Sequence, residues 1–163
     1  MLPKMIISAD CKKMLDEAVH SELYASNLYK HIANQLQRIG YFGATKFFLK
    51  ESADELEHYQ RHVEFQNDVG TVAKVPMIEA MNDTIETLSD AIETGYETEL
   101  ELYNNYKEWY SETSDDPVVQ QFLLQFLEIQ RTSVGEYGDL LARIQLVDQD
   151  KAGMLLIDQE LGG

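Results

Sequence analysis

The sequence predicts an all-α fold, a four-helix bundle with one long connection and a short fifth helix near its C-terminal end. Apolar residues recur at steps of three and four along four long segments, and no stretch alternates as a strand would. No proline interrupts these segments, because Pro3 and Pro76 lie outside them and Pro117 stands at the start of the fourth. The expected helices form a single domain, residues 1–163, and cover residues 8–39, 42–69, 86–111, 117–147 and 152–161.

The ends of the expected helices carry residues that favour helix termini. Gly40 and Gly70 follow the first and second segments, and glycine is the residue most often found just past the end of a helix. Asp115 and Asp116 precede Pro117, which suits a first turn because proline has no amide hydrogen to leave unpaired there. Only a few residues join the first helix to the second and the third to the fourth, so we expect two antiparallel pairs.

The connection between the second and third helices is much longer. It has about 15 residues, 71–85, and at roughly 3.3 Å per extended residue it can span about 50 Å. A helix of about 27 residues is only about 40 Å long. The connection can therefore run the length of the bundle and start the third helix parallel to the second.

Acidic residues outnumber basic ones. Twenty-nine Asp and Glu against 13 Lys and Arg give a formal net charge of −16. Such a charge repels nucleic-acid phosphates and anionic membranes and attracts cations. The single cysteine, Cys11, cannot form an intrachain disulfide, and no apolar run is long enough for a signal peptide or a membrane span. We therefore expect a cytoplasmic protein that binds neither nucleic acid nor membranes.

Each long helix carries a polar side chain near the middle of its apolar face. In the second helix this face contains Ala44, Phe48, Glu51, Glu55, His58, His62, Phe65 and Val69. In the other three helices the central polar residues are Glu22, Glu99 and Gln130. All four helices should therefore bring polar groups to one level of the core.

These polar groups have the chemistry of a metal site. Buried carboxylates without partners are costly and repel one another, and cations would supply the missing charge. Oxygen ligands with one imidazole and no sulfur suit iron or manganese and tolerate zinc. Glu55 and His58 form the Glu-x-x-His unit of dinuclear bundle sites. Glu55 would bridge two ions, with Glu22 and His58 completing one position and Glu99 the other.

Taken singly, these residues have ordinary explanations. A buried glutamate is more often paired with a lysine or arginine, and Tyr29, two turns from Glu22, indicates core packing when considered alone. Glu51 and His62 are either outer ligands or hydrogen-bonded core residues. Trp109 and the other tyrosines are interpreted as packing. The agreement of four helices in phase and height favours the metal site.

At this point the residues resemble those of a known family, the ferritins, in particular the non-haem type with a ferroxidase centre. SELYASNLY at 21–29 is similar to the family's first-helix motif, with Glu22 as metal ligand and Tyr29 as the nearby tyrosine. ADELEH at 53–58 is similar to the second-helix motif, with Glu55 as bridge and His58 as ligand.

The later helices extend the resemblance. Glu99 matches the metal ligand of the third helix, and Gln130 matches the glutamine beside the second iron. The tail GMLLIDQELGG is similar to the short fifth helix of bacterial members.

The resemblance implies iron storage and detoxification. A hollow homo-oligomeric shell of 24 subunits would oxidise Fe(II) with O2 or H2O2 at a di-iron centre and store ferric oxyhydroxide inside. Tyr29 and Gln130 would assist catalysis, Tyr29 by tuning the site or supplying an electron and Gln130 by orienting a ligand water. Glu51 could be an additional iron ligand.

The chain also departs from the family. The third iron site of bacterial members should be incomplete, because its positions hold Asp54, Ile129, Thr132 and Ser133. Leu56 stands where haem-binding members carry methionine, so no haem is expected. The alternative function is that of a di-iron oxidase or peroxidase of the rubrerythrin kind, although its second Glu-x-x-His is missing. A purely structural bundle without metal is a third possibility.

Overall fold

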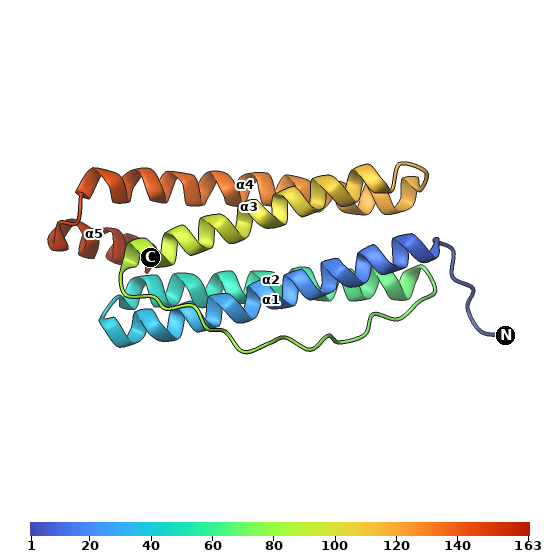
Figure 1. The fold of residues 1–163 in the computed structure, drawn as a ribbon, viewed down its shortest axis with the longest axis horizontal. Coiled ribbons are helices and arrows are strands. Elements are labelled where there is room, and N and C mark those ends of the chain that lie inside the picture. The colour runs from blue at the N-terminus through green and yellow to red at the C-terminus, as the bar shows by residue number, and fades with distance from the viewer.

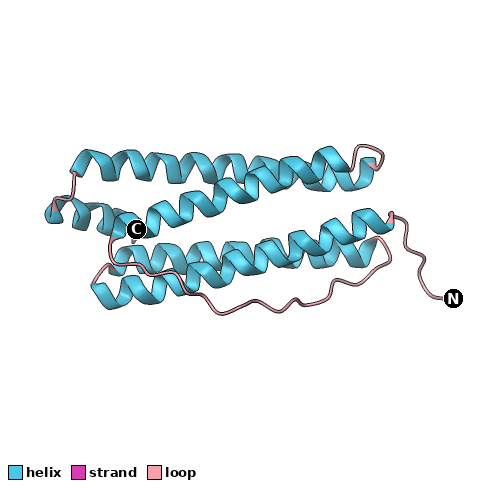
Figure 2. Ribbon diagram, in the orientation of Figure 1, coloured by secondary structure: helices cyan, strands magenta, loops and turns pink.

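The computed structural model describes residues 1–163 and contains helices but no strand (Figures 1 and 2). The helices are α1 (Ala9–Ile39), α2 (Phe42–Asp68), α3 (Leu88–Glu112), α4 (Pro117–Val147) and α5 (Lys151–Leu161). The fold class predicted from the sequence is confirmed. None of the helices carries an apolar stretch long enough to cross a membrane.

Helix α3 begins two residues after the expected residue 86, because a capping box fixes its first turn. Thr87 is the N-cap, and its hydroxyl oxygen accepts a hydrogen bond from the amide of Asp90 at 3.0 Å. The Asp90 carboxylate in turn accepts from the amide of Thr87 at 2.8 Å. These reciprocal bonds satisfy two amides that a helix start leaves unpaired, so the helix begins at Leu88.

The helices pair as the connection lengths predict. α1 packs against α2 and α3 against α4, and the long connection runs along the outside so that α3 starts beside the beginning of α2 (Figure 1). Its final part is held by α1, where His31 Nε2 and Gln35 Nε2 donate to the carbonyl of Asp83 at 2.8 and 3.0 Å. Gln35 also accepts from the amide of Ile85.

The short helix α5 is fixed against the start of α2. Residue Tyr41 gives α2 no side-chain cap, and the buried carboxylate of Asp158 on α5 accepts from the amide of Ala44 at 2.7 Å instead. A carboxylate is favourable there because the N-terminus of a helix is positive. Gly43 permits the close approach, since a Cβ at this position would lie 1.8 Å from the carbonyl oxygen of Asp158.

The apolar core consists of two clusters, one toward each end of the bundle. One contains Tyr29, Phe48 and Tyr137 and includes residues of α5. The other contains Tyr106 and Phe126. The polar residues of the four long helices lie between the clusters, so the core positions them in one layer.

Gly95 lies where α3 meets the buried ring of Tyr137 on α4. A Cβ at residue 95 would lie 2.3 Å from Cε1 of that ring, which has no solvent-exposed space to move into. We therefore expect Gly95→Ala to lower the free energy of unfolding by about 1–3 kcal/mol. Thermal and denaturant unfolding measure the change.

Gly135→Ala is the matched control on α4. A Cβ at residue 135 would meet no atom within 4 Å, so alanine should only improve helix propensity and raise the free energy of unfolding by up to about 1 kcal/mol. A Gly95→Ala variant that is as stable as Gly135→Ala would contradict the close contact with Tyr137.

Candidate metal centre

Four buried side chains, one from each long helix, make up the polar layer. Glu22, Glu99 and Gln130 are fully buried, and Glu55 is 3% exposed. The only basic side chain paired with any of these carboxylates is that of His58. The ordinary explanation of a buried glutamate, an ion pair with lysine or arginine, therefore does not apply here.

Glu22, Glu55 and His58 converge on one point. Each offers a ligand atom, and these atoms all lie within 4.8 Å of one another. His58 Nδ1 lies 3.2 Å from Glu55 Oε2 and 3.6 Å from Glu22 Oε2. Glu22 Oε2 is buried without a hydrogen-bond partner, and such an atom calls for an explanation such as a bound ion. Two carboxylates and an imidazole at this spacing suit a divalent cation.

Glu99 lies in the same layer, but its oxygens are already hydrogen-bonded. The hydroxyl of Tyr29 donates to Glu99 Oε1, and Gln130 Nε2 donates to Glu99 Oε2 at 2.7 Å. Gln130 Oε1 is buried and unpartnered. The second metal position predicted from the sequence is therefore less assembled than the first, with Glu99 and the free amide oxygen of Gln130 as its available donors.

Tyr106 is a member of this layer that the sequence interpretation missed. Its hydroxyl donates to Glu22 Oε1, just as the hydroxyl of Tyr29 donates to Glu99. Each tyrosine lies seven residues after a glutamate, Tyr29 after Glu22 and Tyr106 after Glu99, and each crosses to the glutamate of the other helix. The repeated spacing of seven was the signal in the sequence, and the interpretation of Tyr106 as packing alone was wrong.

His62 is a hydrogen-bonded core residue, one of the two explanations that the sequence left open. Its Nε2 lies 2.6 Å from the hydroxyl oxygen of Tyr106. Because the single proton of Tyr106 is donated to Glu22, His62 must donate its Nε2 hydrogen to the tyrosine oxygen. Nδ1 of the buried ring has no partner.

Glu51 lies beside the layer and is not in the cluster of Glu22, Glu55 and His58. Its Oε2 accepts from the hydroxyl of Tyr137 at 3.3 Å. It lines a pocket of about 620 Å³ between α2 and α4, whose other acidic members are Asp54, Glu55, Glu57, Glu128 and Glu136. His58 also lines this pocket, which therefore gives cations access to the layer. Ile129, Thr132 and Ser133 supply no further carboxylate there.

The carboxyl groups of the layer have pKa values shifted in opposite directions. Burial alone would raise the pKa of Glu22, but its interactions with Glu55 and His58 lower it to about 2. Burial and the adjacent Glu22 raise the pKa of Glu55 well above its usual range. Burial also raises the pKa of Glu99, despite the hydrogen bonds from Tyr29 and Gln130. A cation entering the layer would displace the proton of Glu55, as metal ions do when they bind acidic ligands.

Sequence and structure comparisons identify the family. Residues 12–147 match the family described as Ferritin: Ferritin-like domain. A protein from Haemophilus influenzae, described as a probable bacterial non-heme ferritin-like protein, is 28% identical over 159 residues, 96% of each chain. A ferritin from Pacifastacus leniusculus is 29% identical over 158 residues, 93% of this chain and 87% of that one.

Solved structures agree on the fold. An open pore ferritin from Archaeoglobus fulgidus superposes with a TM-score of 0.93 at 23% sequence identity, over 96% of each chain. Together with the match over residues 12–147, this likeness confirms the resemblance seen in the motifs. The chain belongs to the ferritin family.

Proposed function

We propose that this protein is an iron-storage ferroxidase. It oxidises Fe(II) at two positions in the polar layer, using O2 or H2O2, and deposits ferric oxyhydroxide inside a cytoplasmic shell of identical subunits. The observation that carries the proposal is the convergence of the buried Glu22 and Glu55 with the partly buried His58. Their ligand atoms lie within 4.8 Å of one another, and no lysine or arginine pairs with the two carboxylates. Membership of the ferritin family supports storage as the purpose.

The substrate iron would occupy two positions. Glu22, Glu55 and His58 would hold the first ion, and Glu55, Glu99 and the free Oε1 of Gln130 would hold the second. Negative carboxylates stabilise the ferric state more than the ferrous state, because the attraction grows with the charge of the ion. The layer therefore favours loss of electrons to oxygen.

Neighbouring side chains would position these ligands. Tyr29 and Gln130 both donate hydrogen bonds to Glu99. Gln130 would also orient a water ligand. The acidic pocket between α2 and α4 attracts Fe(II) and leads to Glu55 and His58. No haem is required, and the side chain of Leu56 offers no ligand for one.

The mass of the assembled particle and the iron it holds test the proposal. Purified protein is mixed with excess Fe(II) in air, and particle mass and iron per subunit are measured by analytical ultracentrifugation and elemental analysis. We expect hollow particles of 24 chains of 18.7 kDa, each filled with far more iron than the ligands of the layer can hold. Small particles that hold no iron beyond their metal sites would instead support an oxidase or peroxidase of the rubrerythrin kind.

A further inference from the structure

Tyr106 occupies one of the two carboxylate oxygens of Glu22. Its hydroxyl donates to Glu22 Oε1, whereas Glu22 Oε2 is buried without a hydrogen-bond partner and lies 3.6 Å from His58 Nδ1. Glu99, by contrast, accepts hydrogen bonds on both of its oxygens. Glu22 is therefore held so that only one oxygen, Oε2, is free to bind an ion beside His58 and Glu55.

His62 fixes the hydroxyl of Tyr106 in turn. Its Nε2 lies 2.6 Å from the tyrosine oxygen and donates to it, because the single proton of Tyr106 is donated to Glu22. The other ring nitrogen of His62 is buried without a partner, and burial lowers the pKa of the ring to about 4, so the ring is neutral and carries its one hydrogen on Nε2. His62, Tyr106 and Glu22 thus form a hydrogen-bonded triad that crosses from α2 through α3 to α1.

Aromatic rings hold both donors of the triad in place. The ring centroid of His62 lies 4.4 Å from that of Phe126 and 5.0 Å from that of Phe122. Tyr106 stacks on Phe126 at 5.2 Å, and Trp109 packs edge-on against Tyr106 at 5.1 Å. His62 and Tyr106 are fully buried. Side chains whose rotamers are locked by packing can hold a metal ligand in one orientation.

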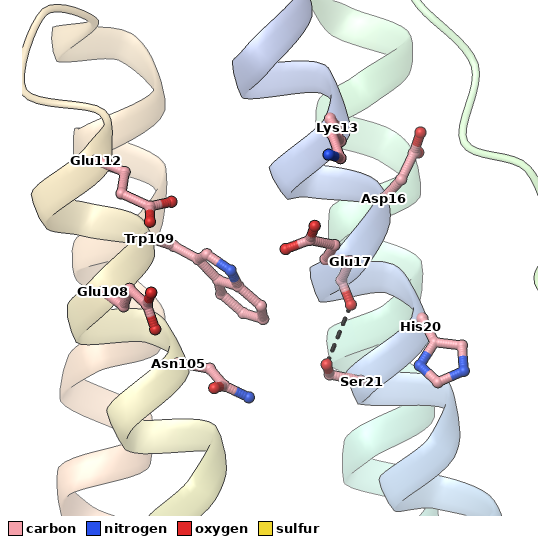
Figure 3. Close-up of a pocket in the computed structure, with 9 residues that line it drawn as sticks. All are labelled: Lys13, Asp16, Glu17, His20, Ser21, Asn105, Glu108, Trp109 and Glu112. Atoms are coloured by element: carbon pink, nitrogen blue, oxygen red, sulfur yellow. Dashed lines mark hydrogen bonds between the residues drawn. The ribbon is translucent and has the colours of Figure 1, made fainter.

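Trp109 separates the triad from the outside of the bundle. Its indole lines a pocket of about 590 Å³ between α1 and α3, where it points from α3 toward α1 (Figure 3). No residue of the triad lines this pocket. Hydrogen bonds in such an interior are electrostatically stronger than in water. The hydroxyl of Tyr106 is therefore reserved for Glu22 and His62.

We propose that His62 and Tyr106 are positioning residues that make Glu22 a one-oxygen ligand and so keep positions on the first ion open for oxygen. The inference rests on the proposed function, because it concerns the ion held by Glu22, Glu55 and His58. Iron sites that react with oxygen combine a few protein ligands with open positions. A carboxylate can bind an ion through one or both of its oxygens. A second oxygen from Glu22 would fill a position that oxygen needs.

Cobalt(II) tests the proposal without any oxidation. Metal-free protein is titrated with Co²⁺ up to one ion per chain, the visible absorption of the bound ion gives its affinity, and azide is then added to bind at the open positions. We expect Tyr106→Phe to weaken Co²⁺ binding by at least about tenfold, as the loss of a partner of a metal ligand does. Azide should bind that complex more weakly by a similar factor, because the freed Oε1 of Glu22 competes for the same position.

A set of variants tests His62 and its dependence on Tyr106. His62→Leu removes the donor and keeps the tyrosine, so both affinities should fall by about threefold, less than in Tyr106→Phe because His62 acts through Tyr106. His62→Gln places an amide donor near the position of Nε2 and should restore the wild-type values. The double variant His62→Leu plus Tyr106→Phe should bind no more weakly than Tyr106→Phe alone, since the two residues act as a unit.

Tyr110→Phe is the matched control. It removes a phenol hydroxyl from a partly buried residue of the same helix, outside the triad, and should match the wild type. Circular dichroism confirms that each variant is folded. The rate of Fe(II) oxidation at saturating Fe(II) is then compared, and His62→Leu should lower it by about threefold. Because this variant retains Tyr106, the slower rate reports on positioning and not on the loss of an oxidisable ring.

The outcomes separate the positioning role from the proposed function. Co²⁺ and azide affinities that are unchanged in both Tyr106→Phe and His62→Leu would overturn the positioning role, and fast Fe(II) oxidation would then leave the ferroxidase proposal standing. A His62→Gln variant that binds Co²⁺ as weakly as His62→Leu would also overturn it, because the imidazole would then act by packing alone. The expected changes in Co²⁺ and azide binding, in a protein that does not oxidise Fe(II), would support the positioning role and overturn the ferroxidase proposal.

Discussion

Replacing both Glu22 and Glu55 with alanine should slow the oxidation of Fe(II) by at least about 100-fold, since loss of even an outer partner of a metal ligand costs 10–100-fold. The two carboxylates are buried, and together with His58 they form the cluster of converging ligand atoms. Without them the first metal position keeps only the imidazole. Stopped-flow absorbance of ferric iron, at equal protein concentration in air, measures the difference.

A matched control separates the loss of ligands from the loss of charge. Glu93 and Glu97 lie exposed on α3, so Glu93→Ala plus Glu97→Ala removes the same two charges away from the layer. This variant should oxidise Fe(II) at the wild-type rate. If both double variants were equally slow, the general acidity of the protein would be responsible, and if neither were slow the polar layer would not be the site of oxidation.

We expect the Glu22→Ala plus Glu55→Ala variant to lose activity without unfolding. Replacing buried charged groups with apolar ones is often neutral or stabilising, because the cost of burying the charges disappears. The metal-free double alanine variant should therefore melt near the wild-type temperature, although the cavities left by the shorter side chains offset part of the gain. If the layer binds a cation as proposed, it does so at a cost in the stability of the metal-free protein.

The convergence of Glu22, Glu55 and His58 could be predicted because these residues interrupt a periodic apolar pattern. Apolar residues would be expected at positions 22, 55, 99 and 130, and polar residues at all four positions, one in each long helix, cannot be explained by packing. The Glu-x-x-His spacing of Glu55 and His58 sets both side chains on one face through helix geometry alone. The lengths of the connections then predicted the helix directions: the two short connections indicate antiparallel pairs, and the long connection allows α3 to run parallel to α2.

Contacts between helices could not be predicted in this way. Tyr106 reaches Glu22 across the bundle, and periodicity places both inside without saying which atoms meet. Asp158 caps α2 from a helix more than 100 residues away, a pairing with no local signal. The hydrogen bonds that occupy the oxygens of Glu99 at the proposed second metal position could not be predicted for a similar reason. They come from Tyr29 and Gln130 and depend on how α1, α3 and α4 pack.

Replacing Glu51 with glutamine should remove a loss of stability that the metal-free protein suffers between about pH 4.5 and 7. Burial, together with the charges of Glu99 and Asp54, raises the pKa of Glu51 from 4.5 to about 7. Between these values the folded protein binds more protons than the unfolded chain, so its stability falls as the pH rises and levels off above pH 7. The full loss is about 3 kcal/mol, at 1.36 kcal/mol for each unit of pKa shift.

The comparison needs two pH values and one control. Glutamine can still accept the hydrogen bond from Tyr137, so the chelator-treated Glu51→Gln variant should unfold like the wild type near pH 4.5 and be more stable by up to about 3 kcal/mol at pH 8. Glu128→Gln changes an exposed acid of the same pocket and should leave the pH dependence as it is. If the Glu51→Gln variant loses stability as steeply as the wild type, Glu51 ionises without cost, and the loss arises from Glu55 and Glu99 instead.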